Sequence, residues 1–259
     1  GDDDNSRRWR IRIQDGDIDR VIIVPQKYLS PQEGSEVGGG RGYKKRKQSK
    51  KTIKKSNNKS VKVVHQIYGI FDDGIPLKNI PVFYENVQKT KAFCKKHKYK
   101  HKMWNLSQCV NLIKKHYPEY LSLWNAFTVP IQRADFVRYC ILHKYGGIYV
   151  DCDIHPLRSL DDLFNKDYFF VTWHDDKQKL PYNAVMGSKK NQSIFVEIMK
   201  HCEESFNKLK KKSIYKTWKG RFVFQTTGHR MLNKVLKEQK VNKKQYVLDV
   251  LRVKSKSGK

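Results

Sequence analysis

Long apolar runs are missing from this 259-residue sequence. No stretch approaches the roughly 20 apolar residues that a membrane-spanning helix needs, and the first residues, GDDDNSRRWR, lack the apolar segment of a signal peptide. We therefore expect a soluble chain with no transmembrane segment. Cysteine is also scarce, because the sequence contains five and no C-x-x-C pair. A zinc knuckle or redox dithiol is not indicated, and free thiols in a reducing compartment are expected.

Acidic residues are few, with 25 against 54 Lys and Arg, which gives a formal net charge of +29. Such a balance favours contact with nucleic acid, an anionic membrane or an acidic substrate, and it says nothing about the fold. Much of the excess lies in residues 41–62, which contain no acid and almost no apolar residue. With the Pro-, Gly- and Ser-rich residues before them, they predict a flexible, Gly- and Lys-rich linker over residues 30–60. It is either a polyanion-binding arm or a solvated spacer.

Two further segments are predicted on either side of this linker. Residues 1–29 contain WRIRIQDGDIDRVIIVP, an alternating pattern around an Asp-Gly turn, which predicts a small β-hairpin appendage. Over residues 61–259, short β-type runs alternate with longer amphipathic segments, which indicates an α/β layered sheet with flanking helices. Strands are expected over 61–68, 99–106, 147–154, 167–173, 182–188 and 246–253, and helices over 82–98, 107–127 with a break at Pro118, 131–145, 192–210 and 227–239.

Two carboxylates, Asp151 and Asp153, follow the apolar run of the strand predicted over 147–154. Side chains alternate along a strand, so both acids are expected on one side and Cys152 on the other. They would lie at the carboxyl end of the strand, where open α/β sheets bind ligands. A divalent cation, Mn²⁺ or Mg²⁺, bridging to a diphosphate would offset their repulsion. An isolated D-x-D also recurs by chance, and an acidic loop capped by Asp153 is the alternative.

The surrounding block, RADFVRYCILHKYGGIYVDCD over residues 133–153, is long and specific. It resembles the signature of the glycosyltransferases whose sugar-binding region contains a DXD motif. That group includes the initiating α-1,6-mannosyltransferase of yeasts and, more distantly, the clostridial glucosylating toxins. Further similarity lies in VVHQIYG, HKMWN and YNAVMGSKKNQSIF, so the resemblance spans residues 61–235. It implies a GT-A type nucleotide-sugar-binding sheet and metal-dependent transfer of a sugar from a nucleotide diphosphate donor, with retention at the anomeric carbon.

The resemblance also implies roles for individual residues. Asp153 matches the direct metal ligand, and Asp151 matches the residue that contacts the metal through water or the donor's ribose and sugar. Asp135 and Arg138 match an Ala-Asp-x-x-Arg element that holds donor-sugar hydroxyls, although their spacing alone equally fits an ordinary i,i+3 ion pair. Asn183 matches an asparagine near the reaction centre, with a structural role in a turn as the alternative.

Three more positions are candidates. Tyr68 stands where the toxins carry a tryptophan that stacks on the nucleotide base, and a tyrosine keeps a flat π surface. A core tyrosine is the alternative. His229 replaces the proline of the family's Thr-Gly-Pro, and it is a candidate metal ligand or diphosphate contact at a helix start. His174, beside two acids, is a similar candidate. A lone histidine is more often structural.

The implied partners are a nucleotide-sugar donor, with GDP or UDP as its nucleotide, and a glycan or glycoprotein acceptor. The basic arm is expected to contact a polyanion, a membrane surface or nothing. Two other classes remain open: a nucleic-acid-binding protein that uses this arm, and an inactive sugar-binding module, against which the intact Asp pair argues. Two carboxylates and a cation also suit another phosphotransfer enzyme. The lysine-rich composition resembles that of large DNA viruses, which predicts host cytoplasm, while a lost anchor would predict the Golgi lumen.

Overall fold

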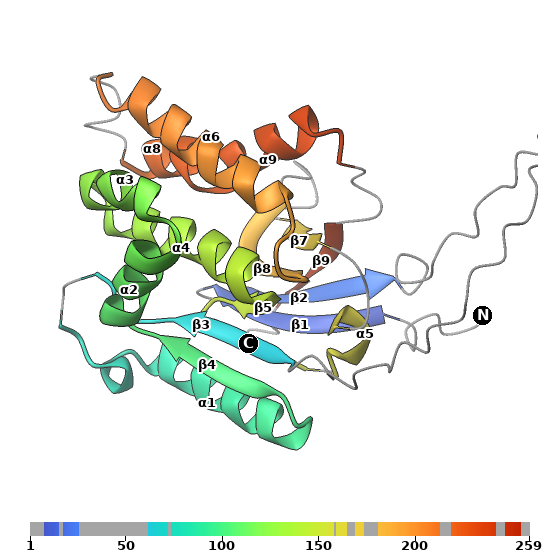
Figure 1. The fold of residues 1–259 in the computed structure, drawn as a ribbon. Helices are drawn as coiled ribbons and strands as arrows, with labels where there is room; N and C mark the ends of the chain where they lie inside the picture. Colours follow the sequence, from blue (N-terminus) through green and yellow to red (C-terminus); the bar gives the residue numbers. More distant parts are fainter. Residues whose placement is uncertain are drawn as a thin grey trace, which may run out of the picture.

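The fold is an α/β arrangement built on one sheet of nine strands (Figure 1). The computed structural model describes residues 8–15, 18–25, 62–71, 74–157, 159–164, 169–173, 181–212, 219–241 and 247–254. The strand order is β4-β3-β5-β8-β7-β9-β2-β1-β6. Strands and helices alternate along most of the chain, and the strands form one sheet. The predicted α/β layered sheet with flanking helices is therefore confirmed.

Three parallel strands form the part of the sheet that positions the candidate site. They are β3 (Val63–Ile67), β4 (Lys100–Trp104) and β5 (Gly147–Val150). β3 lies between the other two and pairs parallel with both. The next strand, β8 (Pro181–Ser188), runs antiparallel to β5. The start of β8 therefore lies beside the end of β5, at the edge where β3 also ends.

The remaining strands continue the sheet beyond β8. They are β7 (Phe169–Trp173), β9 (Val247–Lys254), β2 (Ile18–Pro25), β1 (Arg8–Asp15) and β6 (Ile154–Pro156). β1 and β2 pair antiparallel, β2 pairs with β9, and β1 pairs with β6. Residues 30–60, the predicted linker, lie outside the described residues. The division at residues 29 and 60 stays a prediction.

Helices cover both faces of the sheet, as Figure 1 shows with α1 below it and α2, α4 and α6 above it. They are α1 (Pro81–Lys96), α2 (Leu106–His116), α3 (Leu121–Ala126), α4 (Pro130–Tyr145), α5 (Asp161–Phe164), α6 (Ile194–Leu209), α8 (Lys219–Thr226) and α9 (His229–Glu238). Short 3₁₀ turns occupy Leu77–Asn79 and Pro118–Tyr120. Among the described residues, no helix is long and apolar enough to span a bilayer.

Two apolar clusters hold these layers together. The larger one joins the face of the sheet around Tyr149 and Met186 to α2, α4, α6, α8 and α9. The smaller one lies on the other face, where Val64 and Val150 pack with Cys94 of α1. All five cysteines are buried and free, as the sequence predicted. Burial raises the pKa of the Cys94 thiol to about 12, which keeps it protonated and unreactive.

A pair of glycines turns the chain from α4 into β5. Gly146 has φ +64° and Gly147 has φ +97°, a region of backbone space that favours glycine. A Cβ atom on Gly147 would lie 2.6 Å from the carbonyl oxygen of Val63, in the adjacent strand. Glycine is therefore required here by conformation and by close packing. The sequence had predicted the end of the helix at these residues.

Two details of the predicted elements are wrong. The strand expected over 147–154 ends at Val150, and a turn at Cys152 and Asp153 separates it from β6. Asp151 accepts at its carbonyl from the backbone N–H of Ile154 at 3.1 Å, which closes that turn. Helix α8 was also missed, because a short segment rich in Phe and Gln has no clear helical signal of its own.

Candidate active site

The candidate residues gather at the carboxyl edge of β3 and β5. Tyr68 directly follows β3, Asp151 directly follows β5, and Asp153 comes two residues later. Asn183 is the third residue of β8, the strand that begins at this edge. Helix α4, which lies over this part of the sheet, contributes Asp135 and Arg138. Residues separated by up to 115 positions are thus brought to one place by the parallel pairing of β3 and β5 and the reversal into β8.

The backbone of Asp151 is held from two sides. Its N–H donates to the carbonyl of Ala184 in β8 at 2.8 Å, and its carbonyl accepts from the side-chain amide of Gln66 in β3 at 3.2 Å. The thiol of the next residue, Cys152, points to the carbonyl of Ile67 at 3.2 Å. A turn tied to both neighbouring strands, and not strand alternation, therefore sets where the two acids lie.

The carboxylate of Asp151 is fixed by a tyrosine and an arginine. The hydroxyl of Tyr149 donates to Oδ1 at 2.6 Å, and Nη1 of Arg138 lies 3.2 Å from the same oxygen. The guanidinium of Arg138 also lies over the Tyr149 ring, 4.6 Å from its centroid. One quarter of the Asp151 side chain remains exposed, so this carboxylate is both oriented by the protein and open to a ligand.

Arg138 contacts several of the other site residues and is almost completely buried. Its Nη1 donates to the carbonyl of Asn183 at 2.7 Å, and its Nη2 lies 3.3 Å from Oδ1 of Asp135. Burial lowers the pKa of this guanidinium, but Asp151 and the other anionic partners outweigh that effect and raise it. Arg138 is therefore charged, and it supplies the positive charge that two neighbouring acids need, one of them buried and the other partly exposed.

Behind Arg138 lies a closed polar network. The side-chain amide of Asn183 donates to Oδ1 of Asp135 at 2.9 Å and to the hydroxyl of Tyr139 at 3.0 Å. The hydroxyl of Thr227 donates to the other oxygen of Asp135 at 3.0 Å, and the Tyr139 hydroxyl donates to the Thr227 carbonyl at 2.7 Å. Burial raises the pKa of Asp135, and the charge of Arg138 opposes that rise. These bonds join α4, β8 and the turn between α8 and α9.

The segment before α9 reaches the same network. A Cβ atom on Gly228 would lie 3.6 Å from Oδ2 of Asp135, so the turn between α8 and α9 packs directly against that acid. His229 begins α9, is 5% exposed, and lies against the ring of Phe224 with centroids 4.5 Å apart. Its role as a metal ligand stays a prediction. His174 lies outside the described residues.

Tyr68 lies at the edge of the site with its ring only half-buried. Its hydroxyl donates to the carbonyl of Ile75 at 2.7 Å, and its ring meets that of Phe83 edge to face at 6.4 Å. The backbone N–H of Tyr68 donates to the carbonyl of Trp104 at 2.9 Å, which fixes it to the end of β4. A ring held at its tip and partly exposed can offer its face to a flat ligand.

The acids at this edge suit a divalent cation that is shared with phosphates. Among the residues that the structure describes, no group of three or more His, Cys, Asp and Glu side chains lies close enough to hold a metal ion by itself. Mg²⁺ commonly takes one or two protein carboxylates and completes its shell with substrate phosphates and water. Asp151 and Asp153, at one strand end, provide two such carboxylates. The residues present therefore fit the expected ion.

Three residues of this site were not singled out from the sequence: Tyr139, Tyr149 and Thr227. Tyr149 lies within the Tyr-Gly-Gly-Ile-Tyr run that carried the resemblance, so its position was visible while its hydroxyl contact with Asp151 was not. Thr227 matches the threonine of the family's Thr-Gly-Pro, in which only His229 departs from the pattern. Tyr149 contacts a residue 2 positions away and Thr227 one 92 positions away. A sequence pattern does not show that such hydrogen bonds form, so these roles become visible only in the folded chain.

Residues 46–170 match the family of the glycosyltransferase sugar-binding region containing DXD motif. This region is similar to the DXD-containing glycosyltransferases. The match includes the block that precedes Asp151 and Asp153, and it begins inside the segment predicted as a linker. Together with the α/β sheet, it agrees with the GT-A type of fold that the resemblance implied.

Several known glycosyltransferases are similar to parts of the chain. An uncharacterized glycosyltransferase of Acanthamoeba polyphaga mimivirus is 31% identical over 141 residues, which is 54% of this chain and 54% of that protein. Mannosyl phosphorylinositol ceramide synthase of Saccharomyces cerevisiae is 34% identical over 105 residues, 39% of this chain and 26% of the enzyme. Inositol phosphoceramide mannosyltransferase 3 of Schizosaccharomyces pombe is 32% identical over 106 residues, 40% of this chain and 28% of the enzyme.

The chain thus spans about half of the viral relative and about a quarter of the yeast enzymes. Among solved structures, the chain named PaToxG glycosyltransferase aligns with a TM-score of 0.43 and 16% identity over 69% of each chain.

Proposed function

We propose that this DXD glycosyltransferase region catalyses metal-dependent transfer of a hexose from a nucleotide diphosphate donor, with retention at the anomeric carbon. The observation that carries the proposal is the fixed carboxylate of Asp151 at the carboxyl end of β5, oriented by Tyr149 and Arg138 while a quarter of it stays exposed. A structural acid would be expected to be either fully paired or fully solvated. An acid that is held in place and still accessible suits binding of a cation or donor.

The donor would lie across the carboxyl edge of the sheet. Asp153 would bind Mn²⁺ or Mg²⁺ directly, and Asp151 would contact the ion through water or bind the donor's ribose and sugar. The ion, when bound, supplies positive charge that offsets the charge on the departing nucleotide diphosphate. Tyr68 would stack on the base. His229 stays a candidate for an additional contact to the ion or the diphosphate.

Asp135, Arg138 and Asn183 would act on the donor sugar from one rigid network. Their mutual hydrogen bonds leave each side chain in a single orientation, and preorganised polar groups bind a sugar without reordering at the moment of reaction. We expect these three residues to position donor hydroxyls and to keep Asp151 oriented.

We favour front-face transfer, in which the leaving phosphate accepts the proton of the acceptor hydroxyl. Among the described residues, the acids of the site are Asp135, Asp151 and Asp153; the first is buried within the network and the other two are assigned to the cation and donor. This leaves no carboxylate in a clear position for a covalent two-step route. Trapping of a glycosylated side chain during turnover would contradict this route.

Mannose is the first candidate for the transferred sugar, because the yeast relatives are named as mannosyl-transferring enzymes. A glycan or glycoprotein remains the proposed acceptor. Ceramide lipids are added to the acceptors to be tested, because those relatives are named as enzymes of inositol phosphoceramide mannosylation. The relative from a virus agrees with the proposed viral origin, for which host cytoplasm is the proposed compartment.

The test is nucleotide diphosphate release from a panel of GDP- and UDP-sugars, with Mn²⁺ and with a chelator, for the parent chain and Asp153→Asn. We expect release from one donor, and a loss of at least about 100-fold in the variant because removing a metal contact forfeits several kcal/mol of transition-state stabilisation. Glu204→Gln, on exposed helix α6, is the matched loss of a carboxylate elsewhere and should retain full release. Metal-independent release, or equal release by Asp153→Asn, would contradict the proposal.

A further inference from the structure

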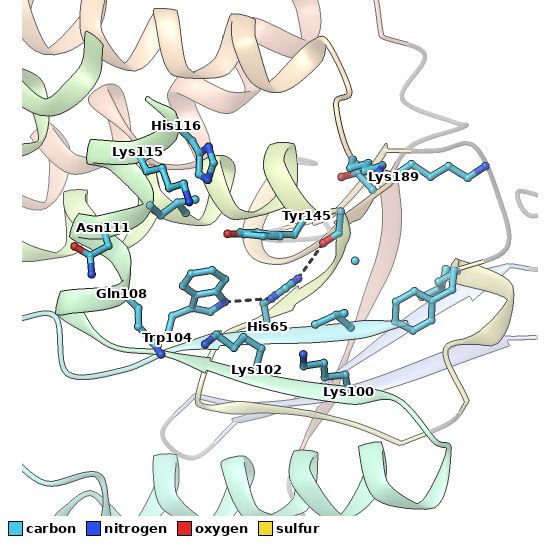
Figure 2. Close-up of a pocket in the computed structure, with 18 residues that line it drawn as sticks. His65, Lys100, Lys102, Trp104, Gln108, Asn111, Lys115, His116, Tyr145 and Lys189 are labelled. Atoms are coloured by element: carbon cyan, nitrogen blue, oxygen red, sulfur yellow. Dashed lines mark hydrogen bonds between the residues drawn. The ribbon is translucent and has the colours of Figure 1, made fainter. Parts of the chain in front are cut away.

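A pocket lies away from the two aspartates. It has a volume of about 860 Å³ and is formed by the face of β3 and β4, by α2, and by the end of α4 (Figure 2). The residues that line it are Val63, His65, Lys100, Lys102, Trp104, Gln108, Asn111, Leu112, Lys115, His116, Tyr145, Gly146, Gly147, Leu163, Phe164, Ser188, Lys189 and Lys190. None of the residues assigned above to the donor, the cation or the reaction is among them.

The pocket and the aspartate edge lie at opposite ends of β5. Gly147, the first residue of that strand, lines the pocket, while Asp151 comes just after the last residue. Four residues of strand separate these positions by roughly 13 Å. Val63 and Lys100, the first residues of β3 and β4, also line the pocket. On β4 the lining extends to Trp104, the last residue of that strand, so the separation from Asp151 is along β5.

The charge of the pocket has one sign. Among the described residues that line it are five lysines and no Asp or Glu. Lys100 and Lys102 are two apart on β4, so their side chains leave the same face of the strand, and Lys115 faces them from α2 in Figure 2. Within the described part of the chain, none of these three forms an ion pair. Like charges that converge on one cavity repel, and a bound anion would relieve that repulsion.

Below these lysines, the base of the pocket is formed by uncharged side chains that hydrogen bonds hold in place. The indole N–H of Trp104 donates to Nδ1 of His65 at 3.1 Å, and because indole is only a donor, Nε2 of His65 must carry the proton and donate to the carbonyl of Gly146 at 2.9 Å. Figure 2 draws both bonds. Burial is the main reason that the pKa of His65 is lowered to about 4. His65 is therefore a neutral part of the base of the pocket, and the lysines are the anion-binding groups.

An aromatic wall and two amides complete the pocket. Tyr145 is 47% exposed, and its ring lies 5.5 Å from that of Trp104, measured between centroids. Lys102 lies over the other aromatic, 5.0 Å from the Trp104 ring. Gln108 and Asn111 line the side formed by α2, and Figure 2 shows them beside Trp104. The apolar face of a sugar ring packs on an exposed aromatic face, and side-chain amides bond its hydroxyls.

We propose that this pocket binds a sugar ring that carries a phosphate group, at a site separate from the donor. Lys100, Lys102 and Lys115 would hold the phosphate, and Tyr145 would pack against the ring. A volume of about 860 Å³ lies within the range of ordinary small-ligand sites. Such a group occurs both as a free sugar phosphate and as the headgroup of a phosphoglycolipid. Binding is an equilibrium property of the folded chain and does not depend on donor turnover.

The test uses glucose 6-phosphate as the probe and titration calorimetry of the full chain. The double variant Lys102→Ala with Lys115→Ala should bind the probe at least about tenfold more weakly for each lysine removed, because each loses a charge-assisted hydrogen bond. The matched control, Lys200→Ala with Lys234→Ala, removes two exposed lysines from α6 and α9 and should bind as the parent does. Equal weakening in both pairs would mean that overall charge or the basic arm is responsible, and would overturn the site.

A second variant separates the ring contact from the charge. Tyr145→Ala should weaken glucose 6-phosphate while leaving inorganic phosphate unchanged, and an equal effect on both probes, or none on either, contradicts the proposed packing. Asp153→Asn should bind glucose 6-phosphate as the parent does, which separates this site from the donor edge. Phosphatidylcholine vesicles with and without phosphatidylglucoside then distinguish the sources: co-sedimentation that depends on Lys102 and Lys115 assigns the lipid headgroup, and its absence alongside probe binding assigns a soluble sugar phosphate.

Discussion

Arg138 Nη1 lies 3.2 Å from Oδ1 of Asp151, which joins the central helix α4 to the end of strand β5. The same guanidinium reaches Asp135 with its Nη2 at 3.3 Å. One buried cation therefore compensates two acids, of which one is enclosed and the other partly exposed. Because Arg138 contacts both acids, the stability of the junction between α4 and β5 depends on it. The orientation of the partly exposed Asp151 depends on it as well.

Replacement of this arginine should be costly. In Arg138→Met the carboxylates of Asp135 and Asp151 lose their buried cation, and breaking a buried pair from one side costs about 3–5 kcal/mol. Urea unfolding measures the loss. Arg221→Met, on the exposed side of α8, is the matched control and should stay within about 0.5 kcal/mol of the parent. Adding Asp135→Asn to Arg138→Met should recover part of the loss, because it removes one of the stranded charges. If the stability losses of Arg138→Met and Asp135→Asn simply add in the double variant, the result would contradict the pairing of Arg138 with Asp135.

Tyr149→Phe tests how the exposed acid is oriented. The variant keeps the ring under Arg138 but removes the hydroxyl that donates to Asp151 at 2.6 Å, so we expect a stability loss of about 1 kcal/mol. Nucleotide release should fall about tenfold, because a less well-positioned acid stabilises the transition state less. Tyr99→Phe also loses hydroxyl bonds, to Ser159 and Leu160 in the smaller apolar cluster. It should show a comparable stability loss with unchanged release.

The sequence was most informative where the pattern is local. Strands β3, β4, β7 and β8 and the long helices lie where periodicity predicted them, and the glycines after α4 end that helix as expected. Alternation failed at Asp151 because it assumes a continuing strand, whereas bonds to Gln66 and Ala184 hold a turn there. Those partners come from two other strands, so no window around the motif contains the information.

The basic pocket illustrates a different limit. Lys100, Lys115 and Lys189 are far apart in the chain and occur among many other lysines. In a sequence with 54 basic residues, each is most simply explained as solvated surface. Their convergence appears only once β4, α2 and the end of β8 are packed together. A cluster of lysines that forms only in the tertiary structure cannot be predicted from the number of lysines in the sequence.

Gly147→Ala should disrupt the junction of α4 and β5. The added Cβ atom would lie 2.6 Å from the Val63 carbonyl and 3.0 Å from Nε2 of His65, at φ +97°. Backbone strain and overpacking together predict a loss of about 3 kcal/mol or more in the free energy of unfolding. Gly220→Ala in α8 is the control, because nothing lies within 4 Å of its Cβ position, and it should be neutral or slightly stabilising. Similar losses in both variants would show that Gly147 is not specifically constrained.

His65 should make the stability of the chain depend on pH. Burial is the main reason that its pKa falls from 6.5 to about 4 in the folded chain. As the pH drops below about 6.5, the unfolded chain therefore takes up a proton first, and stability that is fully present at neutral pH is lost until the folded chain is also protonated near pH 4. A shift of this size corresponds to on the order of 3 kcal/mol.

The measurement is urea unfolding of the parent and of His65→Gln across this range of pH. The variant should start less stable, because the glutamine replaces the acceptor of the Trp104 indole N–H, and it should lose less stability on acidification than the parent. His101→Gln provides a parallel comparison, since burial also lowers the pKa of His101 to about 4, and combining the two substitutions should flatten the dependence further. An unchanged dependence in His65→Gln would mean that His65 takes up a proton as readily in the folded chain as in the unfolded chain, which is incompatible with its burial and with the bond from Trp104 to Nδ1.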